Sequence, residues 1–122
     1  MIRVFLVSDD PVFSQSLCEY LAVQPDIQIC GKAVISVGAA REASELLADI
    51  AILEMQTVDD PEVIDCFKKL SPHLPLFLVA GHPNFEAEKL ALSHGADAVF
   101  PKEDDPKSLV LNARSIYDAM TP

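Results

Sequence analysis

The stretch Asp49–Glu54 constrains the fold of this chain more than any other, because it is a short apolar run that ends in a carboxylate. A strand that is buried on both faces reads as a continuous run of apolar residues. In open α/β sheets, ligand sites lie at the carboxyl ends of such strands. We therefore expect Asp49–Glu54 to be a central parallel strand that places Glu54 at the functional edge of the sheet.

Further apolar runs alternate with helical patterns along the chain. This alternation predicts parallel strands joined by right-handed crossovers, with helices covering both faces of the sheet. The expected fold class is α/β: a doubly wound, five-stranded parallel sheet of the flavodoxin-like order 2-1-3-4-5. The predicted strands cover residues 2–7, 27–35 (an edge strand), 49–54, 76–79 and 98–100.

Asp and Asn next to proline mark where the helices begin. Asp10-Pro11, Asp59-Asp60-Pro61 and Asp104-Asp105-Pro106 each place a capping side chain before a proline, and Asn84 follows Pro83. Gly95 predicts a left-handed helix end. A further helix is expected over residues 37–48. The predicted inward faces are Phe13, Leu17, Tyr20 and Leu21; Ala40, Ala43 and Leu47; Val63, Ile64, Phe67 and Leu70; Ala87, Leu90 and Ala91; and Leu109, Ala113, Ile116 and Met120.

Composition excludes several classes of function. A chain of 122 residues with a net charge of −10 predicts one globular domain over residues 1–122 that binds no nucleic acid by itself. The three cysteines contain no close pair, which argues against a disulfide framework and a zinc site. No stretch reads as a secretory signal or a membrane span, so a cytoplasmic location is expected.

The predicted strand order places the ends of the first and third strands side by side. Asp9 and Asp10 should then lie close to Glu54, with Lys102 as the nearby cation. Asp10 reads as a helix cap or as a metal ligand. Because like charges repel at short range, we expect this crowded acidic cluster to strain the folded state.

At this point the residues resemble the receiver domains of bacterial response regulators, particularly those that precede helix-turn-helix DNA-binding domains. The resemblance implies a role in two-component phosphorelay signalling and transcription regulation. It covers nearly the whole chain. It rests on residues 2–11, Pro25-Asp26-Ile27, Gly31, Asp49–Glu54, Pro72, Pro75, and Gly95-Ala96-Asp97 leading to Pro101-Lys102.

The resemblance implies a phosphorylation site, and most of its positions are changed here. Such receivers hold Mg²⁺ with an acidic pair, accept a phosphoryl group on an Asp, and use a Ser/Thr, an aromatic residue and a Lys as switch positions. The matching positions are Ser8 and Asp9 for the acidic pair, Glu54 for the acceptor, Ala80 for the hydroxyl, Val99 for the aromatic residue, and Lys102. Only Asp9 and Lys102 keep the expected residue type.

These departures predict a degenerate pseudo-receiver that is not an enzyme and works without phosphorylation. Phosphoryl transfer needs strict positioning, which the extra methylene of Glu54 disturbs. Mg²⁺ needs near-octahedral oxygen ligands, so a site left with Asp9 should bind it weakly or not at all, and no other cofactor is expected. Glu54 also resembles a phosphorylated Asp in length and charge. The Ser/Thr and the aromatic residue that would respond to that charge are absent.

Protein partners or a second copy of the chain are the expected ligands. The last two helices and the strand between them form the output face of many receivers, which suggests Val110, Leu111 and Tyr117 as contact residues. Two alternatives stay open. One is a genuine phosphoacceptor that uses Asp9 or Asp10 with Mg²⁺ and Lys102, and the other is a small flavodoxin-like enzyme or nucleotide-binding domain. An output domain beyond Pro122 is compatible with all three.

Overall fold

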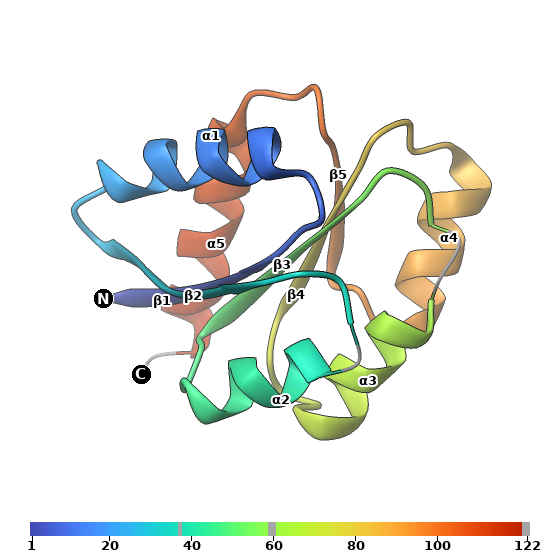
Figure 1. The fold of residues 1–122 in the computed structure, drawn as a ribbon, viewed down its shortest axis with the longest axis horizontal. Coiled ribbons are helices and arrows are strands. Elements are labelled where there is room, and N and C mark those ends of the chain that lie inside the picture. The colour runs from blue at the N-terminus through green and yellow to red at the C-terminus, as the bar shows by residue number, and fades with distance from the viewer. Residues whose placement is uncertain (37, 59–60, 121–122) are drawn as a thin grey trace.

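The computed structural model describes residues 1–36, 38–58 and 61–120 and has one sheet with helices on both sides (Figure 1). In chain order the elements are β1 (Ile2–Val7), α1 (Pro11–Ala22), β2 (Ile27–Ala33), α2 (Gly38–Glu45), β3 (Ile50–Met55), α3 (Glu62–Leu70), β4 (Leu76–Ala80), α4 (Phe85–His94), β5 (Ala98–Pro101) and α5 (Pro106–Met120). The strand order is β2-β1-β3-β4-β5, with parallel pairing throughout. The predicted doubly wound fold is confirmed.

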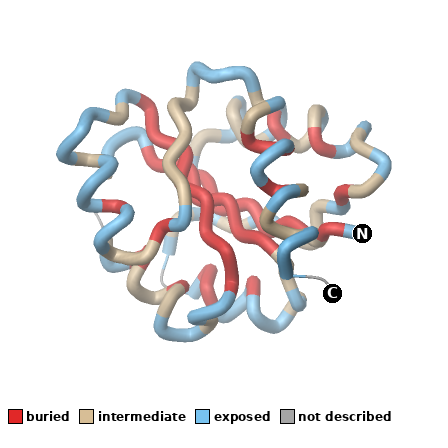
Figure 2. Tube along the Cα trace, turned by 180° about the vertical axis from the view of Figure 1, so that it is seen from behind, coloured by how far each residue is buried: buried red, intermediate tan, exposed pale blue. Residues whose placement is uncertain are grey.

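Two hydrophobic cores enclose the sheet. One core packs α2, α3 and α4 against it, and the other packs α1 and α5. The central strand β3 supplies both cores, because successive side chains of a strand point to opposite faces. All of its six residues are buried, as the continuous apolar run predicts. Figure 2 shows the buried residues gathered along the central strands and the exposed residues on the outer sides of the helices.

Several predicted helix boundaries are confirmed by their capping geometry. The Asp10 side chain accepts hydrogen bonds from two backbone N–H groups at the start of α1, and Asn84 accepts one at the start of α4. Gly95 ends α4 with a φ of 117°, a conformation that favours glycine. The expected cap at residues 59–60 and the expected helix start at Val37 lie outside the described residues.

Leu47 lies outside the core, contrary to the prediction. α2 ends at Glu45, and the backbone closes with hydrogen bonds from Leu47 N to Ser44 O and from Ala48 N to Ala43 O, both 3.1 Å. This is the Schellman pattern, in which the residue after the helix adopts a left-handed conformation. Leu47 accordingly has a φ of 55° and is 75% exposed. The early end of the helix turns this side chain into solvent.

Replacing Leu47 with glycine is expected to raise the free energy of unfolding by about 1 kcal/mol. Glycine adopts positive φ without the Cβ clash that leucine suffers, and this gain exceeds the extra freedom of the unfolded chain. Leu47→Ala is the matched control, because it also removes the exposed side chain and keeps the clashing Cβ. Urea denaturation of the three proteins measures the effect. A glycine variant no more stable than the alanine variant would contradict the proposed strain.

Three further hydrophobic residues that were predicted to face inward are substantially exposed. Leu70 and Met120 are the last residues of α3 and α5, and they are 48% and 46% exposed. Leu90 is 38% exposed on α4, a helix in which Ala91 alone is buried. The exposed face of α4 is thus more apolar than the sequence pattern indicates.

Candidate functional site

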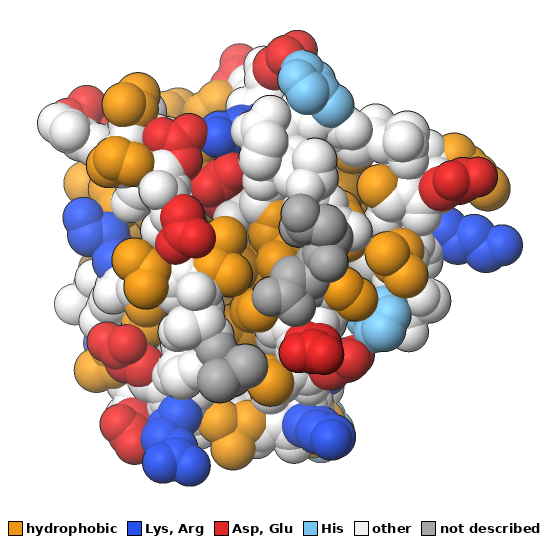
Figure 3. Space-filling view, turned by 45° about the vertical axis from the view of Figure 1, so that its right-hand side comes forward, with side chains coloured by type: hydrophobic (Ala, Val, Ile, Leu, Met, Phe, Trp, Pro, Cys, Tyr) orange, Lys and Arg blue, Asp and Glu red, His pale blue; other side chains and the backbone are white. Residues whose placement is uncertain are grey.

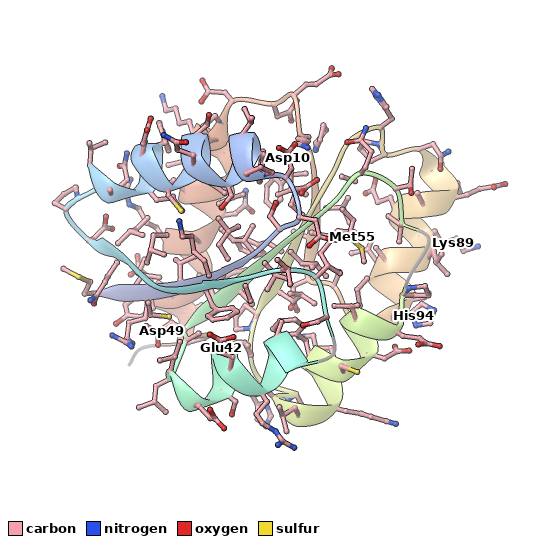
Figure 4. All side chains as sticks on the ribbon, in the orientation of Figure 1. Asp10, Glu42, Asp49, Met55, Lys89 and His94 are labelled. Atoms are coloured by element: carbon pink, nitrogen blue, oxygen red, sulfur yellow. The ribbon has the colours of Figure 1, made fainter. Side chains whose placement is uncertain are left out.

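The carboxyl ends of four strands meet at one edge of the sheet and bring several predicted site residues together. Glu54 near the end of β3 lies opposite Val79 of β4, and Lys102 follows β5, where its N–H donates to the Ala80 carbonyl oxygen at 2.7 Å. In Figure 4, Asp10 and Met55 mark this edge, whereas Asp49 lies at the opposite end of β3. The site therefore occupies the position that parallel α/β sheets use for ligands.

The Lys102 ammonium joins two carboxylates at this edge. Its Nζ lies 2.6 Å from Asp10 Oδ2 and 3.2 Å from Glu54 Oε2. The same Nζ lies 5.2 Å from the centroid of the Phe13 ring, within the range of a cation–π contact. Lys102 thus connects the start of α1 to the end of β3.

Glu54 is a buried carboxylate with a partner for each oxygen. The residue is 3% exposed, its Oε1 accepts a hydrogen bond of 2.7 Å from Ser8 Oγ, and its Oε2 faces Lys102. Ser8 Oγ in turn accepts from the Asp10 N–H at 3.0 Å. Because an unpaired charge at this depth would be costly, Ser8 and Lys102 together make the burial of Glu54 tolerable.

The Asp10 side chain has two roles, and each of its carboxylate oxygens serves one of them. Its Oδ1 accepts from the N–H groups of Val12 and Phe13 at 3.0 and 3.2 Å, which caps α1. Its Oδ2 binds the Lys102 ammonium. The helix cap therefore fixes the direction in which the second oxygen points.

The ion pair between Asp10 and Lys102 shifts the pKa of each partner in the direction that keeps that partner charged. The hydrogen bond from Lys102, followed by that from the Phe13 N–H, holds the pKa of Asp10 below its usual value. Burial lowers the pKa of Lys102, but its hydrogen bonds to Asp10 and Glu54 outweigh this effect and raise it. Asp10 thus contributes stability above about pH 4, which is lost as pH falls through its lowered pKa. Lys102 contributes stability below about pH 10, which is lost as pH rises through its raised pKa.

Asp9 lies apart from the pair, which differs from the expected crowding of three carboxylates. The residue is exposed, and its Oδ1 accepts a hydrogen bond of 2.9 Å from the Ile35 N–H. Ile35 follows β2, so the Asp9 side chain ties the end of β1 to the segment after the edge strand. Asp10 and Glu54 are the two carboxylates that the Lys102 ammonium brings together.

Ala80 and Val99, at the hydroxyl and aromatic switch positions, also lack the side chains that the resemblance implies. Ala80 is buried at the end of β4 and has no hydroxyl group. Val99 packs into the core on the α4 side of the sheet. The neighbouring ring of Phe100 belongs to the opposite core, where its centroid lies 5.4 Å from that of Phe77.

The residues present do not fit Mg²⁺. The oxygens that the resemblance assigns to the ion already have partners: Ser8 Oγ donates to Glu54, Glu54 Oε2 faces an ammonium, and Asp9 accepts from a backbone N–H. Mg²⁺ requires near-ideal octahedral oxygen ligands, and a fixed positive charge beside Glu54 opposes its binding. Within residues 1–36, 38–58 and 61–120, no group of three or more His, Cys, Asp or Glu side chains could hold a metal ion.

The predicted contact residues on α5 differ in their exposure. Val110 is 2% exposed and belongs to the core with α1, so its prediction as a contact residue is wrong; the helix faces the sheet at this position. Leu111 is 53% exposed, whereas Tyr117 is partly buried against the same core. On α4, Phe85 is 80% exposed. In Figure 3, acidic side chains are spread among hydrophobic ones, and Lys and Arg lie mostly at the margins of the view.

The chain is similar to response regulators in sequence and in fold. It is 24% identical over 120 residues to the response regulator protein VraR of Staphylococcus epidermidis, a match that covers 96% of this chain and 57% of that protein. It is 36% identical over 107 residues to a protein-glutamate methylesterase/protein-glutamine glutaminase of Methanospirillum hungatei, covering 84% of this chain and 30% of that protein. A LuxR-family two-component response regulator from Aurantimonas sp. superposes with a TM-score of 0.85 at 20% identity, covering 96% of this chain and 85% of that chain. No family model matches the chain.

The chain thus has the fold of response regulator receiver (CheY-like) structures, and its relatives in sequence are response regulators and a protein-glutamate methylesterase/protein-glutamine glutaminase. The chain spans 57% of the length of the VraR relative and 30% of the methylesterase, so the activities of the whole relatives are properties of longer proteins. The helices of the described residues include none that is both long and apolar enough to cross a bilayer.

The sequence predicts Lys102 as the cation near Asp10 and Glu54, and the structure shows both contacts. Two other features of the site were missed: the hydrogen bond from Ser8 to Glu54 and the placement of Phe13 beside the ammonium, both of which depend on side-chain direction. One signal could have singled out Asp10 from Asp9. An Asp that caps a helix at the end of a strand uses one oxygen for the helix and leaves the other facing the sheet edge.

Proposed function

We propose that this domain is a phosphorylation-independent receiver that signals through protein contacts. One observation carries the proposal: the Lys102 ammonium is bound to both Asp10 and Glu54, at the edge where a receiver would bind Mg²⁺ and a phosphoryl group. The fixed cation supplies the charge balance that a metal would otherwise provide. The domain therefore does not switch between two states through phosphorylation, and it is not itself an enzyme.

The chemistry of the site argues against phosphoryl transfer to Glu54. Its side chain is buried, and its oxygens are occupied by Ser8 and Lys102, so neither is free for in-line attack. Ala80 offers no hydroxyl to hold a phosphoryl oxygen. Since phosphoryl transfer depends on positioning and charge stabilisation, the loss of these contacts removes most of the catalytic power that a receiver has.

The alternative phosphoacceptor, Asp9 or Asp10, is less well supported. Asp10 uses one oxygen to cap α1 and the other to bind Lys102, so neither is free to attack. Asp9 is exposed and accessible, but its carboxylate is hydrogen-bonded to the Ile35 N–H rather than paired with a cation that would stabilise a transferring phosphoryl group. The second alternative, nucleotide binding, would need a phosphate-binding loop after β1, and an acidic segment follows β1 instead.

The exposed apolar residues of α4 and α5 are the proposed contact surface. Phe85 and Leu111 are large, apolar and exposed, and they replace the predicted Val110, which is buried. Such residues become favourable contacts when a partner or a second copy covers them, because burial removes apolar area from water. The proposal therefore predicts an association that is the same with and without a phosphodonor.

Sedimentation of the purified domain tests this function. The distribution of monomer and dimer is expected to be unchanged by acetyl phosphate with Mg²⁺. Leu111→Asp is expected to weaken self-association, or the binding of a partner purified from the source cell, by about tenfold or more. Val23→Asp, at an exposed apolar residue after α1 and away from α4 and α5, serves as the control. Association that appears only with the phosphodonor, or that ignores Leu111→Asp, would contradict the proposal.

A further inference from the structure

A cavity of about 170 Å³ lies beside Lys102, between α1 and the loop from β5 to α5. Its wall is mostly apolar and comes from two helices and the last two strands: Phe13, Leu17, Val79, Phe100 and Leu109. A closed apolar cavity of roughly 150 Å³ is sufficient to bind benzene. This space therefore has room for one aromatic ring, and its open mouth leaves room for a polar substituent.

The rim of the cavity is acidic. Asp104 and Asp105 lie in the loop at its mouth, and both are exposed. Asp105 Oδ1 accepts from the Lys107 N–H, whereas the Asp104 carboxylate has no partner among the described residues. Lys102 also lines the cavity, but its charge is already balanced by two carboxylates. The local charge is thus negative and favours a positively charged ligand.

We propose that this cavity binds a small molecule that carries an aromatic ring and a primary ammonium group. The ring occupies the apolar wall, where it meets the rings of Phe13 and Phe100, and the ammonium lies at the mouth beside Asp104. This arrangement combines apolar burial with a single charged contact that fixes orientation, as small-molecule sites commonly do.

A ligand bound in the cavity would also affect the site at the end of β3. Phe13 and Lys102 line the cavity, and the same two residues form the cation–π contact beside Glu54. A ring placed against Phe13 would therefore bias the position of the Lys102 ammonium. In this respect the inference rests on the proposed function, because it offers a signal input for a receiver that takes no phosphoryl group.

Chemical-shift mapping of the ¹⁵N-labelled chain with 2-phenylethylamine tests the binding. Saturable shifts with a dissociation constant in the millimolar range or below are expected for so small a ligand, centred on the amides of Phe13, Leu17, Lys102 and Ser108. Phenylacetate, which has the same ring and the opposite charge, should bind more weakly. Equal binding of the two compounds, shifts centred elsewhere, or no saturable shift would overturn the proposal.

Two pairs of variants separate the ring contact from the charge contact. Ser16→Phe fills the mouth from an exposed position on α1 and should abolish the shifts, whereas Gln15→Phe, one residue away and outside the lining, should leave them unchanged. Asp104→Asn should weaken 2-phenylethylamine binding by about two- to fivefold, the range expected for an exposed ion pair. Glu103→Gln, an exposed acid that does not line the cavity, is its control.

The outcomes also distinguish this inference from the proposed function. Concentration-dependent shifts of the same amides without any ligand would show that a second copy of the chain fills the groove, and would overturn the small-molecule assignment. If 2-phenylethylamine does not bind, the proposed phosphorylation-independent function still stands. A phosphoryl adduct on the chain would overturn the proposed function and leave the binding result standing.

Discussion

Replacing Lys102 with methionine is expected to lower the free energy of unfolding by about 2–4 kcal/mol at neutral pH. Methionine keeps the length and the apolar stem of lysine but removes the ammonium that Asp10 and Glu54 share. Removing one partner of a buried ion pair leaves the other charge uncompensated, which commonly costs about 3–5 kcal/mol. The lower range is expected here because Asp10 is partly solvated. Urea denaturation at pH 7 measures the change.

Lys107→Met is the matched control for this experiment, because Lys107 is an exposed lysine with no side-chain partner among the described residues. It should change the free energy of unfolding by less than about 0.5 kcal/mol. The loss caused by Lys102→Met should shrink below about pH 4, as Asp10 becomes protonated. A Lys102→Met protein as stable as the Lys107→Met protein at pH 7 would show that the site does not depend on this cation.

Replacing Ser8 with aspartate should destabilise the domain by about 2–4 kcal/mol in the presence of a chelator, and Mg²⁺ should reverse the loss. The substitution removes the hydroxyl that donates to Glu54 Oε1 at 2.7 Å and places a second carboxylate beside it. Two like charges about 4 Å apart repel by about 4 kcal/mol at an effective dielectric of 20, and Lys102 offsets part of this. Two facing carboxylates can then hold Mg²⁺.

Ser8→Asn separates charge from size in the same experiment, because it has nearly the shape of aspartate without the charge. The asparagine variant should gain nothing from millimolar Mg²⁺, and neither should the parent. Thermal unfolding with chelator and with Mg²⁺ gives the comparison. A parent protein stabilised by Mg²⁺ as strongly as Ser8→Asp would show that the natural site already binds the ion.

The fold could be predicted from the sequence because its signals are local and repeated. The apolar run at Asp49–Glu54 and the capping signals at Asp10 and Asn84 correspond to elements that the structure confirms. Leu47 was placed wrongly because helical periodicity does not show where a helix closes. The αL turn there lacks the glycine that would have marked it.

The candidate site was only partly predictable, because strand ends fix positions but not side-chain directions. The positions of Glu54 and Lys102 follow from the strand order, and the two residues do meet. Whether Asp9 or Asp10 joins them depends on where the second oxygen of the capping Asp10 points and on the Ile35 N–H that holds Asp9. The sequence marks the cap itself, but it marks neither of these side-chain directions. Val110 was placed on the surface because it sits beside the main apolar stripe of α5, yet it is buried in the core that α1 and α5 share with the sheet.

Intact-mass measurement after incubation with acetyl phosphate and Mg²⁺ tests the central claim most directly. The claim is that Lys102 and Ser8 hold Glu54 in a closed network that accepts no phosphoryl group. The predicted result is an unchanged mass, for the parent and equally for Glu54→Gln, in which no acceptor carboxylate exists at that position. A stoichiometric gain of one phosphoryl group by the parent that Glu54→Gln abolishes would contradict the account, and a gain abolished instead by Asp9→Asn or Asp10→Asn would establish the alternative phosphoacceptor.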